Sequence, residues 1–171
     1  MKIYPMKERV IGHIVAEKAA LHGDRTFVRF EDRSYSYREL DLLSNRIANG
    51  LVQLGVNKGT HVALMLDNKP EIILIYFALG KLGAVAVPLN TAAKGELLAY
   101  YLMQSDSEMV IADAALVPRI AAVAARASKL RQIVCLRDDK APTSDSGETG
   151  LPQSDFSDLL AAADTDRKSV V

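Results

Sequence analysis

The stretch HVALMLDNKPEIILIYFALGKLGAVAVPLN, residues 61–90, decides the fold class. It begins with an apolar strand over residues 61–66, and Pro70 then opens a helix that is apolar almost all round. A second apolar strand follows and ends near Pro88, and we expect it to be buried. Strands without polar alternation that are joined by a helix are typical of a parallel sheet covered on both faces. The stretch therefore predicts an α/β fold.

The same alternation continues downstream. Helical patterns cover residues 94–106 and 115–128, and apolar strands cover residues 108–113 and 132–138. The helix over 94–106 is expected to turn four side chains inward: Leu97, Leu98, Tyr101 and Leu102. Four apolar strands separated by helices predict a mostly parallel sheet with helices on both faces, joined by right-handed crossovers.

Upstream, the sequence predicts a helix, a hairpin and a longer helix. An amphipathic helix is expected over residues 7–23, with one face formed by Val10, Ile11, Ile14, the aliphatic stem of Lys18 and Leu21. Residues 26–30 and 33–36 are expected to pair as a short hairpin. The longer helix is expected to run from Ser36 to about Gly55, because Ser36 and Glu39 have the spacing of a capping box.

The composition changes after residue 137. The following residues are mostly Asp, Ser, Thr, Gly and Pro, which is typical of a solvated loop. We therefore expect an α/β subdomain over residues 1–137, a polar loop over 138–153, and a short capped helix with a tail over 154–171.

Charge and cysteine content limit the possible partners. The 21 basic residues balance the 21 acidic ones, so no net field draws the chain to nucleic acid or to an anionic membrane. The single cysteine, Cys135, cannot form an internal disulfide. The N-terminus lacks the apolar core of a signal peptide, and the most apolar run is broken by glycine and lysine, so no membrane span is expected. These features favour a cytoplasmic protein with a small-molecule or protein partner.

Three passages match motifs of one known family. Residues 36–40, SYREL, resemble its early (T/S)Y-x-E-L motif, and residues 55–64, GVNKGTHVAL, resemble its G-V-x-x-G-D-x-V-A-L passage. Residues 82–90, LGAVAVPLN, are similar to its x-G-A-x-x-V-P-L-N passage. The order and spacing agree with the N-terminal region of acyl-CoA synthetases, the AMP-binding, adenylate-forming enzymes related to luciferases. Thr60 stands where that family usually has Asp, which we expect to alter only local turn hydrogen bonding.

The resemblance implies a parent enzyme that activates a carboxylic acid with ATP and Mg²⁺ and then forms a thioester with CoA. The matching passages are scaffold in that family. Its chemistry comes from a Ser/Thr/Gly-rich loop with a Lys, an aromatic-Gly-x-Thr-Glu stretch, an Asp on the ribose and a Lys in a mobile C-terminal domain. We therefore expect no catalytic or cofactor-binding residue within residues 1–171, no activity from them alone, and the remainder of the chain as their partner.

Residues 143–153, TSDSGETGLPQ, resemble the Ser/Thr/Gly-rich loop that binds the ATP phosphates in that family. However, Glu148 would repel a phosphate, and Gln153 supplies no positive charge. In the family the true loop follows an F-x-x-L-L helix, which Phe156, Leu159 and Leu160 resemble. An ordinary surface loop around Gly147 and Gly150 is therefore expected, with the phosphate loop beyond Val171.

Polar residues follow two predicted strands, at the ends where open sheets place ligands. Asp67 and Asn68 follow the first strand, and Asn90 and Thr91 follow the second. One interpretation makes them part of the wall of the acyl or nucleotide pocket. The alternative for the first pair is that Asp67 or Asn68 caps the helix that Pro70 opens, and a similar choice applies to the second pair.

Other candidates carry less chemistry. Three histidines, His13, His22 and His61, are too widely separated for a metal site, and no G-x-S-x-G motif supports a nucleophilic serine. Tyr100 and Tyr101 could line a tunnel, but adjacent helical positions diverge, so one is expected to pack and the other to be solvated.

Two rival functions stay open. The chain could be a stand-alone interaction or regulatory module that keeps the scaffold without the chemistry, or an unrelated nucleotide-binding sheet protein. A wall that lacks its counterpart exposes apolar surface, so self-association is also expected.

Overall fold

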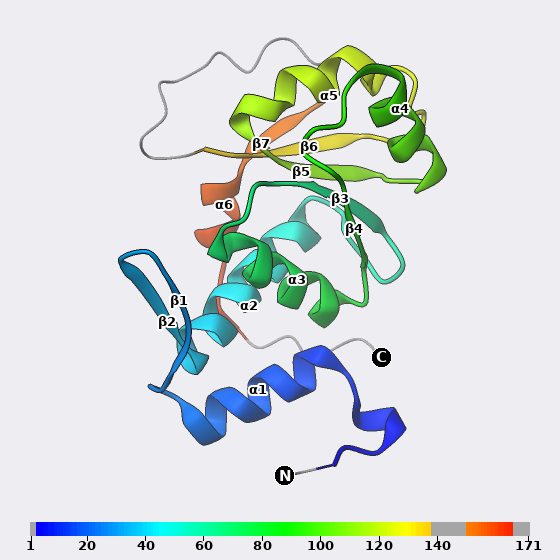
Figure 1. The fold of residues 1–171 in the computed structure, drawn as a ribbon. Helices are drawn as coiled ribbons and strands as arrows, with labels where there is room; N and C mark the ends of the chain where they lie inside the picture. The colour runs from blue at the N-terminus through cyan, green and yellow to red at the C-terminus, as the bar shows by residue number, and fades with distance from the viewer. Residues whose placement is uncertain (1–2, 138–149, 166–171) are drawn as a thin grey trace. The chain divides into compact units, whose positions relative to one another are not determined.

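The computed structural model describes residues 3–137 and 150–165. Figure 1 shows the order of their helices and strands. The chain divides into two compact units, each assembled from separate stretches. We call them the sheet unit, Thr60–Asp67 and Val85–Asp158, and the helical unit, Met1–Gly59, Asn68–Ala84 and Leu159–Val171.

The sheet unit contains a five-stranded parallel sheet. Its strands are β3 (His61–Met65), β4 (Val85–Pro88), β5 (Met109–Asp113), β6 (Gln132–Leu136) and β7 (Gln153–Asp155), in the spatial order β4-β3-β5-β6-β7. Two helices, α4 (Gly95–Gln104) and α5 (Val117–Ala124, after the 3₁₀ turn Ala114–Leu116), pack together and share a buried apolar cluster with the sheet. The prediction of an α/β fold with a mostly parallel sheet flanked by helices is confirmed.

The sequence did not predict strand β7. Its residues, Gln-Ser-Asp, are polar and have little intrinsic preference for a strand. The strand is instead held by its pairing with β6 and by side-chain contacts to Ser154 and Asp155. Nε2 of Gln132 donates to the Ser154 hydroxyl at 3.0 Å, and Nε of Arg137 donates to Oδ2 of Asp155 at 2.7 Å.

Strand β4 is less buried than we predicted. It lies at the end of the strand order, so β3 is its one neighbouring strand among the residues that the structure describes. Its residues are half-buried or exposed, with Val85 at 40% exposure. An apolar sequence alone cannot distinguish an edge strand from a central one, because the difference lies in the neighbours.

The helical unit contains α1 (Ile11–His22), α2 (Tyr37–Gln53) and α3 (Pro70–Leu82), which pack against one another. A 3₁₀ turn, Met6–Glu8, precedes α1, and an antiparallel hairpin of β1 (Thr26–Phe30) and β2 (Arg33–Ser36) separates α1 from α2. Helix α6 (Phe156–Leu160) begins in the sheet unit and ends in the helical unit.

The predicted start of α2 is confirmed. The amide of Glu39 donates to Oγ of Ser36 at 3.2 Å, and the amide of Ser36 donates to Oε2 of Glu39 at 2.8 Å. Together these bonds form a complete capping box. They also lower the pKa of the Glu39 carboxyl, chiefly through the Ser36 amide and then through its hydroxyl.

The predicted inward faces of two helices are only partly confirmed. Helix α1 buries Gly12, Val15 and Ala19, whereas Ile11 and Leu21 are exposed. Small residues allow neighbouring helices to approach closely, so contact area here does not follow side-chain size. In α4, the buried residues are Leu98, Ala99 and Leu102, while Leu97 is 50% exposed and Tyr101 is half-buried.

Among the described residues, no helix has both the length and the hydropathy needed to cross a membrane.

Candidate functional site

The carboxyl ends of β3 and β5 lie at the topological switch point of the sheet. From β3 the chain passes to β4 on one side, and from β5 it passes to β6 on the other. Asp67 follows β3 and is exposed, whereas Asp113 ends β5 and is buried. The amide of Asp67 donates a hydrogen bond to Oδ2 of Asp113 at 2.7 Å. The structure therefore joins the ends of these two strands directly, at the place where open sheets bind ligands.

Asp113 is a residue that the sequence reasoning missed. It ends the otherwise apolar strand MVIAD, and this isolated acidic residue is the signal that could have identified it. A buried carboxylate needs hydrogen-bond donors, so its position after a buried strand indicates a defined partner.

Asn90 and Thr91 lie at the same edge of the sheet, after β4. Oδ1 of Asn90 accepts a hydrogen bond from the amide of Ala92 at 2.8 Å, which shapes the local turn. The carbonyl of Thr91 accepts from Nη1 of Arg119 at 2.9 Å, which joins this turn to α5. Both contacts organise the loop that follows β4.

Asn68 belongs to the helical unit. It borders a hollow of about 260 Å³ whose other lining residues come from β1 and the start of α3: Val28, Phe30, Lys69, Pro70, Ile72 and Ile73. The capping alternative is not what the structure shows, because the N-cap of α3 is Lys69 and no side chain caps it by a hydrogen bond.

A second hollow, of about 380 Å³, lies between β4 and α4 in the sheet unit. Its lining residues are Val87, Pro88, Leu89, Asn90, Tyr100, Tyr101, Gln104 and Ser105. Tyr101 packs against the buried cluster while Tyr100 is 57% exposed, as the sequence predicted for adjacent helical positions. Both rings nevertheless border the same hollow, with their centroids 6.2 Å apart.

Two of the three histidines make local contacts. Nδ1 of His61 lies 2.6 Å from the carbonyl oxygen of Ser105, and the His22 ring lies against Tyr37 with a centroid distance of 5.4 Å. Within residues 3–137 and 150–165, no group of three or more His, Cys, Asp or Glu side chains could hold a metal ion.

Cys135 lies in β6 and is buried. Burial raises the pKa of its thiol, which keeps the less reactive protonated form dominant at neutral pH. The environment of Cys135 is therefore that of a buried strand residue rather than of a reactive thiol.

Most of residues 143–153, the segment that resembles a phosphate loop, lies outside the described residues, including Gly147 and Glu148. The described end leads from Gly150 into β7, where Asp155 pairs with Arg137. Burial alone would raise the pKa of Asp155, but hydrogen bonds from Ser157 and Arg137 outweigh it and lower that pKa.

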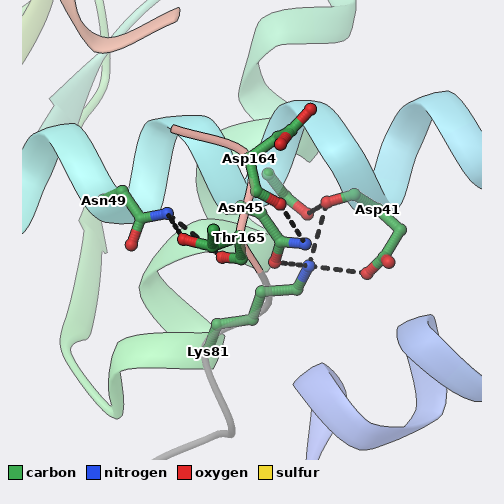
Figure 2. A network of polar contacts seen from close by, with 7 residues as sticks. Asp41, Asn45, Asn49, Lys81, Asp164 and Thr165 are labelled. Carbon is green, nitrogen blue, oxygen red and sulfur yellow. Dashed lines mark hydrogen bonds and ion pairs between the residues drawn. The ribbon is translucent and has the colours of Figure 1, made fainter. Parts of the chain in front are cut away.

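A buried lysine in the helical unit is the other feature that the sequence reasoning missed. Lys81 lies in α3 and is only 1% exposed. Its Nζ donates to Oδ1 of Asn45 at 2.6 Å, to Oδ1 of Asp41 at 2.7 Å and to the Asp41 carbonyl at 3.1 Å. Three donors meet three acceptors, so the cost of removing the ammonium group from water is offset. Figure 2 shows this arrangement.

Asp41 and Asn45 are four residues apart on α2, and Asn49 follows after another four, so all three occupy one face of the helix. The side chains of Asn45 and Asn49 contact the segment that follows α6 (Figure 2). A sequence signal existed, namely a lone lysine in an apolar helix and polar residues repeated every four positions in α2.

The sequence and the fold identify the class of protein. The family described as AMP-binding enzyme matches residues 15–169, so the chain belongs to that family. Its relatives include CoA ligases, and solved structures of a CoA ligase and of a fatty acyl CoA synthetase share its fold. These matches confirm the resemblance to acyl-CoA synthetases.

Two curated relatives illustrate the match. The medium/long-chain-fatty-acid–CoA ligase FadD6 of Mycobacterium tuberculosis is 38% identical over 117 residues, which cover 68% of this chain and 20% of that protein. The crotonobetaine/carnitine–CoA ligase of Salmonella typhimurium is 36% identical over 132 residues, which cover 74% of this chain and 26% of that protein. The matches thus cover about a fifth to a quarter of the length of these relatives.

Solved structures share the fold. A Mycobacterium tuberculosis fatty acyl CoA synthetase is 27% identical with a TM-score of 0.78, over 98% of this chain and 31% of that chain. The anthranilate CoA ligase AuaEII in complex with anthranoyl-AMP has a TM-score of 0.79 at 23% identity, over 98% of this chain and 30% of that one.

Proposed function

We propose that this chain is the N-terminal part of an ATP-dependent carboxylic acid–CoA ligase. In such an enzyme, a substrate carboxylate attacks the α-phosphorus of ATP and releases pyrophosphate, and the thiol of CoA then displaces AMP from the acyl-adenylate. The observation that carries the proposal is family membership over residues 15–169, together with 36–38% identity to CoA ligases.

ATP, Mg²⁺ and CoA are the proposed cofactors of the complete enzyme, which we place in the cytoplasm and in fatty acid metabolism. The strand ends described here do not fit a triphosphate. Asp67 and Asp113 both lie at the switch point, where the Asp67 amide bonds to the Asp113 carboxylate, and negative side chains there would repel phosphate oxygens. We therefore assign nucleotide binding to polypeptide beyond these residues, and we expect residues 1–171 alone to be inactive.

The role proposed for the strand ends is a supporting wall of the substrate pocket. Asn90 and Thr91 belong to an ordered turn after β4, and Asp67 is tied to Asp113, so these groups have fixed positions on the sheet unit. Asn68 is proposed separately as a wall residue of the hollow at the start of α3, within the helical unit. Fixed polar groups around an apolar hollow are the composition that small-molecule sites have.

Pyrophosphate exchange tests the proposal. ATP and a panel of fatty and aromatic acids would be supplied both to residues 1–171 and to the product of the uninterrupted reading frame. We expect acid-dependent exchange only from the longer product. Exchange by residues 1–171 would refute the assignment of the catalytic groups to other polypeptide. A stop codon directly after Val171, with no exchange, would refute the ligase and favour the regulatory module.

A further inference from the structure

The segment Ala163–Thr165, which we call the strap, is held on α2 by two asparagine side chains. Nδ2 of Asn49 donates to the carbonyl of Ala163 at 2.6 Å and to the carbonyl of Thr165 at 3.1 Å. Nδ2 of Asn45 contacts the Asp164 carbonyl at the longer distance of 3.5 Å. Two amides one helical turn apart therefore contact three successive backbone carbonyls (Figure 2).

These contacts use main-chain atoms of the strap. Two contacts involve side chains of the strap: Nη2 of Arg46 donates to Oδ2 of Asp164 at 3.3 Å, and Nδ2 of Asn49 donates to Oγ1 of Thr165 at 3.4 Å. Arg46 and Asp164 are both well exposed, so their ion pair contributes little. Binding of the strap should thus depend on its main-chain carbonyls and only weakly on its side chains.

Lys81 determines which way the Asn45 amide points. An asparagine amide presents an acceptor at one end and a donor at the other. Because Nζ of Lys81 occupies the Oδ1 end at 2.6 Å, the Nδ2 end is left facing the strap. A flipped amide would place two donors against each other inside the protein, where an unsatisfied polar group is costly.

We propose that Asn45 and Asn49 form a docking site for main-chain carbonyls, that its occupant is the strap, and that Lys81 is a positioning residue acting through Asn45. The site fixes the strap, which follows α6 in the sequence, on the surface of α2. For the proposed ligase, and resting on that proposal, these residues would influence catalysis only through the polypeptide that follows the strap.

Carbonyl ¹³C shifts of the labelled 171-residue chain test the site, because such shifts respond to hydrogen bonds accepted by the carbonyl. Asn49→Asp keeps the shape of the side chain and removes its donor. We expect the Ala163 and Thr165 shifts to move toward their values in an unfolded peptide. Gln104→Glu makes the same chemical change at an exposed residue of the sheet unit and should leave the strap shifts unchanged. Unchanged strap shifts in Asn49→Asp would overturn the proposal.

Lys81→Met tests the positioning role. We expect the Asp164 carbonyl shift of the folded protein to move, because the Asn45 amide loses the partner that orients it. A loss of stability with an unchanged Asp164 shift would mean that Lys81 has only a structural role. If Lys81→Met fails to fold, Asn45→Asp decides whether Asn45 contributes, since it keeps an acceptor for Lys81 and removes the donor to the strap. An unmoved Asp164 shift in that variant would contradict the model of two amides.

Strap side chains provide the complementary test. Asp164→Ala and Thr165→Ala preserve the carbonyls, so the Ala163 shift should stay at its native value. Loss of the native shift would show that side chains hold the strap. None of these measurements involves ATP, acid or CoA, so their failure is distinct from failure of the ligase proposal.

Discussion

The backbone amide of Asp67 and the carboxylate of Asp113 are joined by a hydrogen bond of 2.7 Å between the ends of strands β3 and β5. Asp113 is buried, and the bond lies at the point where the chain reverses its direction of progress through the sheet. The contact therefore orders the loop that leaves β3, which carries Asp67, a proposed pocket-wall residue.

Replacing Asp113 tests the strength of this link. Asp113→Ala removes the acceptor and leaves a backbone amide without its partner, so we expect a loss of about 1–3 kcal/mol in the free energy of unfolding. Asp113→Asn keeps a carbonyl acceptor and should lose less. Urea denaturation of both variants measures the difference, and equal stability of Asp113→Ala and the native chain would show that the bond contributes nothing.

The four apolar strands of the sheet were predictable because their signals are local, whereas the polar strand β7 was not. Apolar runs of strand length separated by helical patterns specify parallel strands. The Ser36–Glu39 spacing specifies a capping box whatever the neighbouring elements are. The burial of β4 and the inward face of α1 were not predictable in this way. They depend on which elements become neighbours, and for α1 the relevant residues are small, so they stand out poorly among the larger apolar side chains.

The candidate sites show the same division. Asp67, Asn90 and Thr91 could be placed at one edge of the sheet, because the carboxyl ends of parallel strands share an edge. The bond to Asp113 and the network around Lys81 were missed, because each joins residues that are distant in the sequence. A buried charge in an apolar run indicates that a partner exists, but the sequence does not say which one.

The capping box gives a prediction for pH dependence. The folded pKa of Glu39 lies below its unfolded value of about 4.3, so the stabilisation is complete above that value and is lost as pH falls through the folded pKa. Ser36→Ala removes the hydroxyl bonds and should cost about 0.5–2 kcal/mol near neutral pH. Denaturation between neutral and acid pH should show a smaller acid-induced loss in Ser36→Ala than in the native chain. Parallel pH profiles would contradict this assignment.

Gly50→Ala should destabilise the protein although alanine is the better helix former. In an ordinary helix position the change stabilises by about 0.5–1 kcal/mol. At Gly50, however, the added Cβ would lie 2.7 Å from Cα of Leu159, a backbone atom that cannot move aside cheaply. We expect a net loss of about 1–3 kcal/mol, the range for inserting a methyl group into a packed contact. Thermal unfolding measures the sign, and a raised melting temperature would show that Leu159 does not lie tightly against Gly50.

Self-association is the remaining prediction, and the structure offers a specific surface for it. Leu97, Tyr100 and Met103 recur every three residues along α4 and are 50%, 57% and 50% exposed. Neighbouring exposed apolar side chains favour contact with another protein surface. We expect light scattering to show a mass that rises with concentration, and Leu97→Glu with Met103→Lys to restore a monomer without changing the net charge. The matched control, Glu96→Lys with Arg126→Glu, also preserves net charge but keeps the apolar residues, so it should still associate. A native chain that stays monomeric at high concentration would show that this surface does not mediate self-association.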